Sequence, residues 1–205
     1  LLLELVQGGE LWDLLYQSDH LPRTRFGGLQ ENHARMYTAC IASAFAHIHG
    51  GSYAYRDLKA ENLLIDAEGY IKIVDFGFAK KLEKGQKTQT LCGTPEYLSP
   101  ELVLSKGHNH GVDYWALGIL IFKLLCGITP FANPNQSKVF MKIVHSKRCL
   151  IFPPDFPRDV KDLIQKLLTP NPTLRLGVLR GEIQDILFHR WFAGIDWDKL
   201  EGRRY

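Results

Sequence analysis

The sequence predicts a single, mainly α-helical domain with one small antiparallel β element. Two observations indicate helices: several segments carry apolar residues at three- and four-residue spacing, and one later segment is apolar nearly all round. A third observation indicates the β element, because two short apolar runs flank a glycine-containing turn. No internal repeat, low-complexity tract or clear linker divides the 205 residues, so we expect one domain.

The N-terminal quarter is expected to contain a short buried strand, a short helix, a basic glycine-containing loop and a long amphipathic helix. These elements are predicted over residues 1–6, 10–17, 22–28 and 30–49. The long helix has the clearest pattern, since Met36, Cys40, Ala44 and other apolar residues recur at helical spacing. Gly50-Gly51 is expected to end it.

A β-hairpin is predicted next, with strands over 62–66 and 70–74 and a turn at 67–69. Residues 76–101 show no sustained periodicity and are rich in Gly, Thr, Lys and Pro. A loop of that length in a compact domain is more often functional than idle.

The rest of the chain is predicted to be helical. Helices are expected over residues 111–127, 136–145, 157–168 and 182–192. The first of these is apolar nearly all round, so it is expected to be the central buried helix of the domain.

The composition excludes several classes of protein. The chain is 45% hydrophobic, which is too apolar for a disordered tail, and its net charge of +3 is too small to predict a nucleic-acid surface. The longest apolar stretch, residues 115–122, is too short to span a bilayer. The four cysteines are far apart and form no CxxC pair, so free thiols in a reducing compartment, the cytoplasm or the nucleus, are expected.

Residues 55–62 (YRDLKAEN) and 75–77 (DFG) carry the most chemical information. Antiparallel pairing of the predicted hairpin puts Asn62 opposite residue 74, so Asn62 and Asp75 are expected side by side at one end of the sheet. Two oxygen donors beside a third carboxylate, Asp57, suit a hard cation such as Mg²⁺. Lys59 adds a positive charge, and the set as a whole suits a metal-bridged phosphoanion.

These motifs resemble those of protein kinases. The pattern [HY]-R-D-L-K-x-E-N matches with Tyr55 in the first place, D-F-G matches at Asp75, and A-P-E matches at Ser99-Pro-Glu101 with Ser for Ala. The three motifs occur in the kinase order and at kinase-like separations. The segments TLCGTPEYL, DYWALGIL and HRWFAGIDW resemble the cyclic-nucleotide-dependent kinases of the AGC group.

The resemblance implies a protein-kinase-like fold and an ATP- and Mg²⁺-dependent serine/threonine kinase. It aligns residues 1–9 with the hinge and residues 10–205 with the large helical C-terminal lobe. The glycine-rich flap, the small-lobe lysine and the small-lobe glutamate are absent from the sequence, so the small N-terminal lobe is expected to be missing. We therefore expect a truncated catalytic lobe that is poorly active by itself.

The resemblance also assigns catalytic roles. Asp57 matches the base that accepts the substrate hydroxyl proton, and Lys59 matches the lysine that steadies the transferring phosphoryl group. Asn62 and Asp75 match the Mg²⁺ ligands. Thr94 matches the hydroxyl that orients Asp57 and Lys59 in serine/threonine enzymes.

Nucleotide contacts follow from the same alignment. Backbone groups of Glu4 and Val6 would face adenine, Leu64 and Val74 would floor its pocket, and Glu10 would contact the ribose. Basic residues before the target Ser or Thr of a protein substrate would meet acidic positions at Glu10 and Glu61.

Lys123 departs from the family pattern, which usually has a further glutamate there for an arginine of the substrate. A lysine would repel that arginine. The alternative is a lysine at the helix rim that extends its charge into solvent.

The long loop matches an activation loop with a phosphorylation site at Thr90. A phosphate there would order the loop by pairing with Arg56 and Lys80. Three more matched residues would be structural, namely Glu101, Arg175 and Asp113, of which the first two resemble a buried ion pair.

Two other readings stay open. The chain could be a non-catalytic kinase-like module that binds or regulates a partner. A metal-dependent nuclease or phosphatase could use the same carboxylates, although the lysine-containing loop and the Thr94 segment argue against it. In the kinase reading, the partners are protein substrates and a regulatory subunit or domain.

Overall fold

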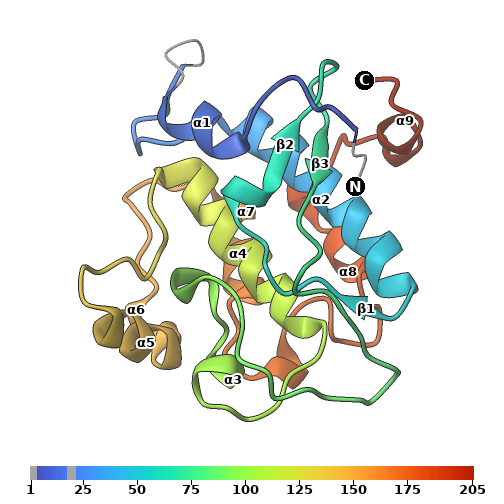
Figure 1. Cartoon of the computed structure of the whole chain (residues 1–205). Helices are drawn as coiled ribbons and strands as arrows, with labels where there is room; N and C mark the ends of the chain where they lie inside the picture. The colour runs from blue at the N-terminus through green and yellow to red at the C-terminus, as the bar shows by residue number, and fades with distance from the viewer. Residues whose placement is uncertain (1–3, 18–21) are drawn as a thin grey trace.

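The computed structural model describes residues 4–17 and 22–205, and it shows a helical body with a small β-hairpin at one end (Figure 1). The α-helices of the described residues are α1 Leu11–Tyr16, α2 Glu31–Gly50, α3 Pro100–Val103, α4 Gly111–Cys126, α5 Gln136–Val144, α6 Ser146–Cys149, α7 Arg158–Leu167, α8 Gln184–Leu187 and α9 Trp197–Glu201. The strands are β1 Tyr53–Ala54, β2 Leu63–Ile65, β3 Ile71–Ile73 and β4 Lys80–Lys81. Short 3-10 turns are η1 Ala60–Asn62, η2 Pro95–Tyr97, η3 Pro172–Leu174 and η4 Arg190–Phe192.

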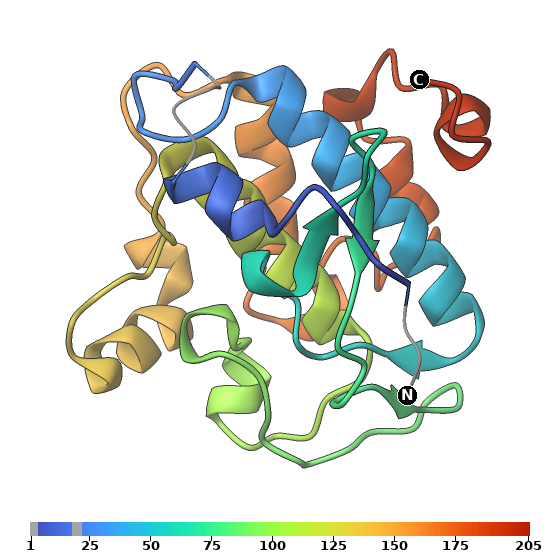
Figure 2. The same ribbon diagram turned by 45° about the horizontal axis from the view of Figure 1, so that its top comes forward.

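Helix α4 is the centre of the core, as the sequence predicts. All of its residues are buried, and it packs most closely against α7 and also against α2 (Figures 1 and 2). Trp115 on α4 is fully buried and stacks on Phe131 with ring centroids 6.0 Å apart. The helix ends where Gly127 adopts a left-handed conformation at φ 73°, and its N–H bonds to the Lys123 carbonyl.

The β2–β3 hairpin has the predicted register. Leu63 pairs with Ile73 and Ile65 pairs with Ile71, and the next bond runs from the Val74 N–H to the Asn62 carbonyl (3.0 Å). The turn is held by Asp66, whose Oδ1 accepts the Tyr70 N–H at 2.9 Å.

The two faces of this hairpin have different neighbours. Leu63 and Ile65 join the main hydrophobic core, while Leu64 on the opposite face is half-buried. Because strand side chains alternate and paired residues share a face, Leu64 and Val74 lie on the same outer face.

Several predicted elements differ from the structure. Residues 1–3 of the expected strand 1–6 lie outside the described residues, and residues 4–6 form no strand because no neighbouring strand in the described chain bonds to them. The expected helix 182–192 is instead divided into α8 and η4, with the His189 side chain accepting the Trp191 N–H between them. The short elements β1, β4, α6 and α9 were not predicted.

In the part of the chain that the structure describes, no helix is both long enough and apolar enough to cross a membrane.

Candidate active site

Asp113 fixes the backbone of the loop that carries Asp57. Its Oδ2 accepts the Tyr55 N–H at 2.9 Å, and its Oδ1 accepts the Arg56 N–H at 2.7 Å. The same carboxylate lies 2.8 Å from Nε2 of His49, at the end of α2. Arg56 has φ 70°, a conformation that costs energy for a non-glycine residue, and the two bonds from Asp113 offset that cost.

The Asp57 carboxylate is 4% exposed and has two partners. Asn62 donates through Nδ2 to Asp57 Oδ2 at 2.8 Å, and it also bonds to the Asp57 carbonyl at 3.0 Å. Lys59 Nζ lies 3.1 Å from Asp57 Oδ2. These contacts hold a buried carboxylate in one orientation, beside a cation that offsets the cost of burying it.

Asp75 lies two residues after the end of β3 and is exposed, with a left-handed φ of 56°. Its Oδ1 accepts the Gly77 N–H at 3.1 Å, which closes a tight turn. Val74, the residue before it, is bonded to Asn62, so the backbones of Asn62 and Asp75 adjoin at the predicted end of the hairpin. The buried Tyr55 hydroxyl donates to the Val74 carbonyl at 2.5 Å and fastens this end of the hairpin to the loop.

The donor types fit a magnesium ion that is shared with a nucleotide. Asn62 uses its amide nitrogen on Asp57, which leaves the amide oxygen as the group for a cation, and Asp75 supplies an exposed carboxylate. No cluster of three or more His, Cys, Asp or Glu that could hold a metal occurs within residues 4–17 and 22–205. Mg²⁺ at such sites uses one or two protein carboxylates, with water and phosphate oxygens completing its coordination.

The predicted nucleotide residues lie along the outer face of the hairpin. Glu10 forms an isolated antiparallel bridge with Leu64, and the Gly8 N–H bonds to the Ile65 carbonyl at 2.8 Å. The segment before α1 therefore runs beside β2, which brings Glu10 next to Leu64. Glu4 is exposed and forms an ion pair with Lys72, and Val6 is half-buried.

Thr94 lines a small cavity. Asp57, Asp113 and Tyr97 line the same cavity. Among the described residues no hydrogen bond joins the Thr94 side chain to Asp57 or Lys59, so its orienting role stays a prediction. The backbone approaches closely here, because a Cβ added to Gly93 (φ 104°) would lie 3.0 Å from the Arg56 carbonyl oxygen.

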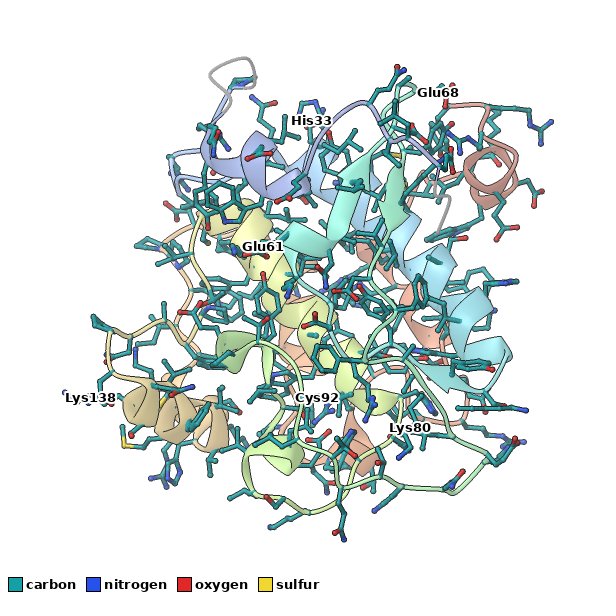
Figure 3. All side chains as sticks on the ribbon, in the orientation of Figure 1. His33, Glu61, Glu68, Lys80, Cys92 and Lys138 are labelled. Atoms are coloured by element: carbon teal, nitrogen blue, oxygen red, sulfur yellow. The ribbon has the colours of Figure 1, made fainter. Side chains whose placement is uncertain are left out.

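Thr90 is exposed on the long loop, and its hydroxyl lies 3.4 Å from that of Thr88. Lys80 donates to Thr88 rather than to Thr90, at 2.9 Å. Arg56 donates through Nε to the Phe78 carbonyl at 2.8 Å. Figure 3 places Lys80 and Cys92 on this loop, below Glu61 at the start of the hairpin.

Glu101 and Arg175 form a buried bidentate ion pair, with distances of 2.7 and 2.8 Å. Arg175 is fully buried and also donates to the carbonyls of Gly111 (2.8 Å) and Thr169 (3.2 Å). The arginine thus ties α3 to the start of α4 and to the loop after α7. We call Asp113, His49, Glu101 and Arg175 the anchor network.

Lys123 is only 7% exposed, so it is not a lysine that extends into solvent. Its Nζ lies 5.4 Å from the centre of the Tyr16 ring and 5.7 Å from that of Tyr97, which are cation–π distances. Glu61 is near the same two rings, since it raises the pKa of both tyrosines, after the larger effect of burial. In the described part of the chain, the buried Glu61 Oε2 has no hydrogen-bond partner.

Sequence reasoning missed His49 and His108. His49 bonds to Asp113, 64 residues away, and its Nδ1 lies 2.9 Å from the Tyr114 hydroxyl. His108 is 3% exposed and pairs with Thr88 through two backbone bonds. No motif or spacing marks either residue, because their partners are distant in the sequence.

Residues 1–192 match the protein kinase domain family, and the chain belongs to it. It is 47% identical over 203 residues to human cGMP-dependent protein kinase 2, covering 99% of this chain and 26% of that protein. It is 47% identical over 204 residues to a cAMP-dependent protein kinase catalytic subunit of Dictyostelium discoideum, covering 100% of this chain and 30% of that protein. It is 46% identical over 208 residues to the mouse cAMP-dependent protein kinase catalytic subunit PRKX, covering 100% of this chain and 54% of that protein.

The chain thus spans about a quarter of the length of the cGMP-dependent kinases that it matches. The resemblance to kinases of the AGC group and the kinase-like helical fold predicted from the sequence are both confirmed.

Proposed function

We propose that the protein is an ATP-dependent serine/threonine protein kinase and that this chain carries its catalytic groups. One observation carries the proposal: Asp57 is held by Asn62 and Lys59 at 2.8 and 3.1 Å, beside the hairpin end from which Asp75 emerges. A carboxylate base, a cation and two oxygen donors for a metal are the parts that phosphoryl transfer requires.

In the proposed reaction, the substrate hydroxyl oxygen bonds to the γ-phosphorus of ATP as the bond from that phosphorus to the bridging oxygen breaks. The hydroxyl proton passes to Asp57, and ADP leaves. Lys59 offsets charge on the transferred group. Bound Mg²⁺ supplies charge neutralisation at the phosphates, and Asn62 and Asp75 are its proposed ligands.

The proposed nucleotide surface is the outer face of the hairpin with the adjoining segment. Leu64 and Val74 give an apolar floor for the adenine ring, Glu10 faces the ribose, and the backbone at Glu4 and Val6 faces the base edge. The antiparallel bridge between Glu10 and Leu64 supports this assignment, because it places the two residues side by side.

The proposed protein substrates carry basic residues before the target Ser or Thr. The unpartnered Glu61 carboxylate oxygen supports this, because a buried acceptor without a partner favours an incoming donor. Lys123 lies near the same tyrosines, so we propose that it disfavours an arginine at the adjoining substrate position.

We further propose that Thr90 is a phosphorylation site that orders the long loop. The γ-phosphoryl group of ATP would bond to Thr90 Oγ1 while ADP leaves and a base on the phosphorylating kinase takes the proton. Thr90 is exposed, whereas its neighbour Thr88 is 6% exposed and already bonded to Lys80. A regulatory subunit or domain and a location in the cytoplasm or nucleus are also proposed, the latter supported by four free cysteines.

The test of the catalytic proposal is Asp57→Asn in the protein as its own gene encodes it. Removing a general base is expected to lower kcat about 10²- to 10⁴-fold, with nucleotide binding nearly unchanged. The measurement is transfer of labelled γ-phosphate to a peptide with arginines before a serine, together with ATP affinity by calorimetry.

Asp155→Asn is the matched control, because Asp155 is an exposed aspartate on the loop between α6 and α7. Full turnover in Asp57→Asn would refute the base assignment. Nucleotide binding without any phosphotransfer in the unmodified protein would favour the non-catalytic kinase-like module.

A further inference from the structure

His108 is a buried histidine whose Nε2 has no hydrogen-bond partner among residues 4–17 and 22–205. The residue is 3% exposed, so bulk solvent has little access to it. A buried polar atom without a partner is costly and requires an explanation, such as an absent ion.

The position of His108 directs its side chain toward the phosphorylatable part of the loop. Thr88 and His108 exchange two backbone hydrogen bonds, each 2.9 Å, so they are a directly opposed antiparallel pair. Side chains of such a pair share one face with Cβ atoms about 5 Å apart. Thr90 is on that face too, because its hydroxyl lies 3.4 Å from that of Thr88.

Positive charge gathers on this face. Lys80 Nζ bonds to Thr88 Oγ1 at 2.9 Å, and Arg56 has a buried Nη1 without a partner. The pKa of His108 is lowered, mainly by burial and next by the Arg56 cation, with a smaller contribution from Lys80.

The nearby carboxylates are already used. Glu101 and Asp113 both oppose the lowering of the His108 pKa, yet Glu101 is bonded to Arg175, and Asp113 is bonded to two backbone N–H groups and His49. Among the described residues, Nη1 of Arg56 and Nε2 of His108 therefore still lack acceptors.

We propose that His108 is a ligand of a phosphate group on Thr90, together with Arg56 and Lys80. We call Arg56, Lys80 and His108 the anion cradle. The proposal rests on the phosphorylation of Thr90 proposed above and adds a third, titratable partner. The Nε2–H of His108 donates to a phosphate oxygen, so the bound dianion stabilises the protonated imidazole and His108 stabilises the dianion.

The test uses the chain with phosphothreonine incorporated at position 90 during translation, so no kinase is needed. The phosphate is titrated by ³¹P NMR in the unmodified sequence, in His108→Phe and in His108→Gln. We expect the midpoint to lie roughly one pH unit higher in His108→Phe than in the unmodified sequence, since a nearby opposite charge is lost. Glutamine, which retains an N–H donor without the charge, should give an intermediate midpoint.

His47→Phe is the control, because His47 is exposed on α2 and should leave the midpoint unchanged. Equal midpoints in the unmodified chain and His108→Phe would overturn the proposal. If the phenylalanine variant does not fold, ¹⁵N titration of the His108 imidazole decides: the midpoint must rise when Thr90 carries phosphate, and an unchanged midpoint overturns the proposal.

Two further variants separate this inference from the proposed phosphorylation site. If Arg56→Gln and Lys80→Gln raise the phosphate midpoint but His108→Phe does not, the site stands and the role of His108 is wrong. A second outcome would contradict more. If the phosphate midpoint in the unmodified chain equals that of phosphothreonine in a free peptide, and none of the three variants changes it, the ordering role of Thr90 fails as well.

Discussion

The anchor network and the anion cradle are both polar clusters beside the Asp57 loop, but they differ in how their hydrogen bonds are satisfied. In the anchor network, both oxygens of Asp113 and both oxygens of Glu101 have partners. In the anion cradle, His108 Nε2 and Arg56 Nη1 have none. A saturated cluster can hold the loop permanently, whereas an unsaturated one gains its partner only when an anion arrives.

Arg56, a member of the anion cradle, is also bonded to Asp113 of the anchor network. Its backbone N–H is held by Asp113, and its guanidinium faces the cradle. An event at the cradle therefore acts on the residue immediately before Asp57. This connection gives a physical route from the state of Thr90 to the orientation of the proposed base.

The largest effect is expected from Arg175→Met, which removes the Glu101–Arg175 ion pair of the anchor network. The change leaves the Glu101 carboxylate buried without a partner, so we expect the free energy of unfolding to fall by about 3–5 kcal/mol in urea titrations. The double variant Arg175→Met with Glu101→Leu should recover most of the loss. Arg148→Met, on the exposed face of α6, is the control; a loss at Arg175 no larger than that at Arg148 would contradict the structural role.

A smaller effect is expected for Asp113→Asn. The amide keeps one acceptor but presents N–H groups toward a backbone donor, so the free energy of unfolding should fall by roughly 1–3 kcal/mol. Hydrogen exchange should accelerate at the amides of Tyr55 and Arg56, which is the sharper test because it reports the loop itself. Asp198→Asn on exposed α9 serves as the control. Unchanged exchange at both amides would show that Asp113 does not hold the loop.

The smallest effect concerns pH. Burial lowers the pKa of His108, His110 and His189 below the ordinary histidine value. The unfolded chain therefore binds more protons than the folded chain near and below pH 6.5, and the free energy of unfolding should fall as pH decreases from about 7.5 to about 5.5. Urea titrations across this range measure the slope.

His108→Phe should make the slope shallower in the unphosphorylated chain, by removing one of the three histidines whose pKa burial lowers. A slope that does not respond to this substitution would place the pH dependence elsewhere in the molecule.

Much of the fold follows from local patterns in the sequence. The α2, α4 and α7 helices and the β2–β3 register were predicted because periodicity and turn chemistry act between near neighbours. The helix expected at 182–192 was wrong, since His189 caps a new turn and breaks the helix, which a count of apolar residues does not detect. The paired strands β1 and β4 were missed because two-residue strands have no period to read.

The candidate site likewise has features that local sequence patterns predict and features that they do not. The adjacency of Asn62 and Asp75 depends on one hairpin, so the sequence was enough to predict it. The burial of Lys123 between Tyr16 and Tyr97 was not predictable, because the three residues come from separate segments that meet only in the folded chain.

The sequence alone determined the family, the order of the motifs and the local geometry of the hairpin, because these depend on residue identity and short-range spacing. Only the tertiary structure decided which buried polar groups have partners and which do not. Those pairings join residues as far apart as Glu101 and Arg175, and they are set by packing around α4. The unpartnered nitrogen of His108 is visible only once every other hydrogen bond of its neighbourhood is known.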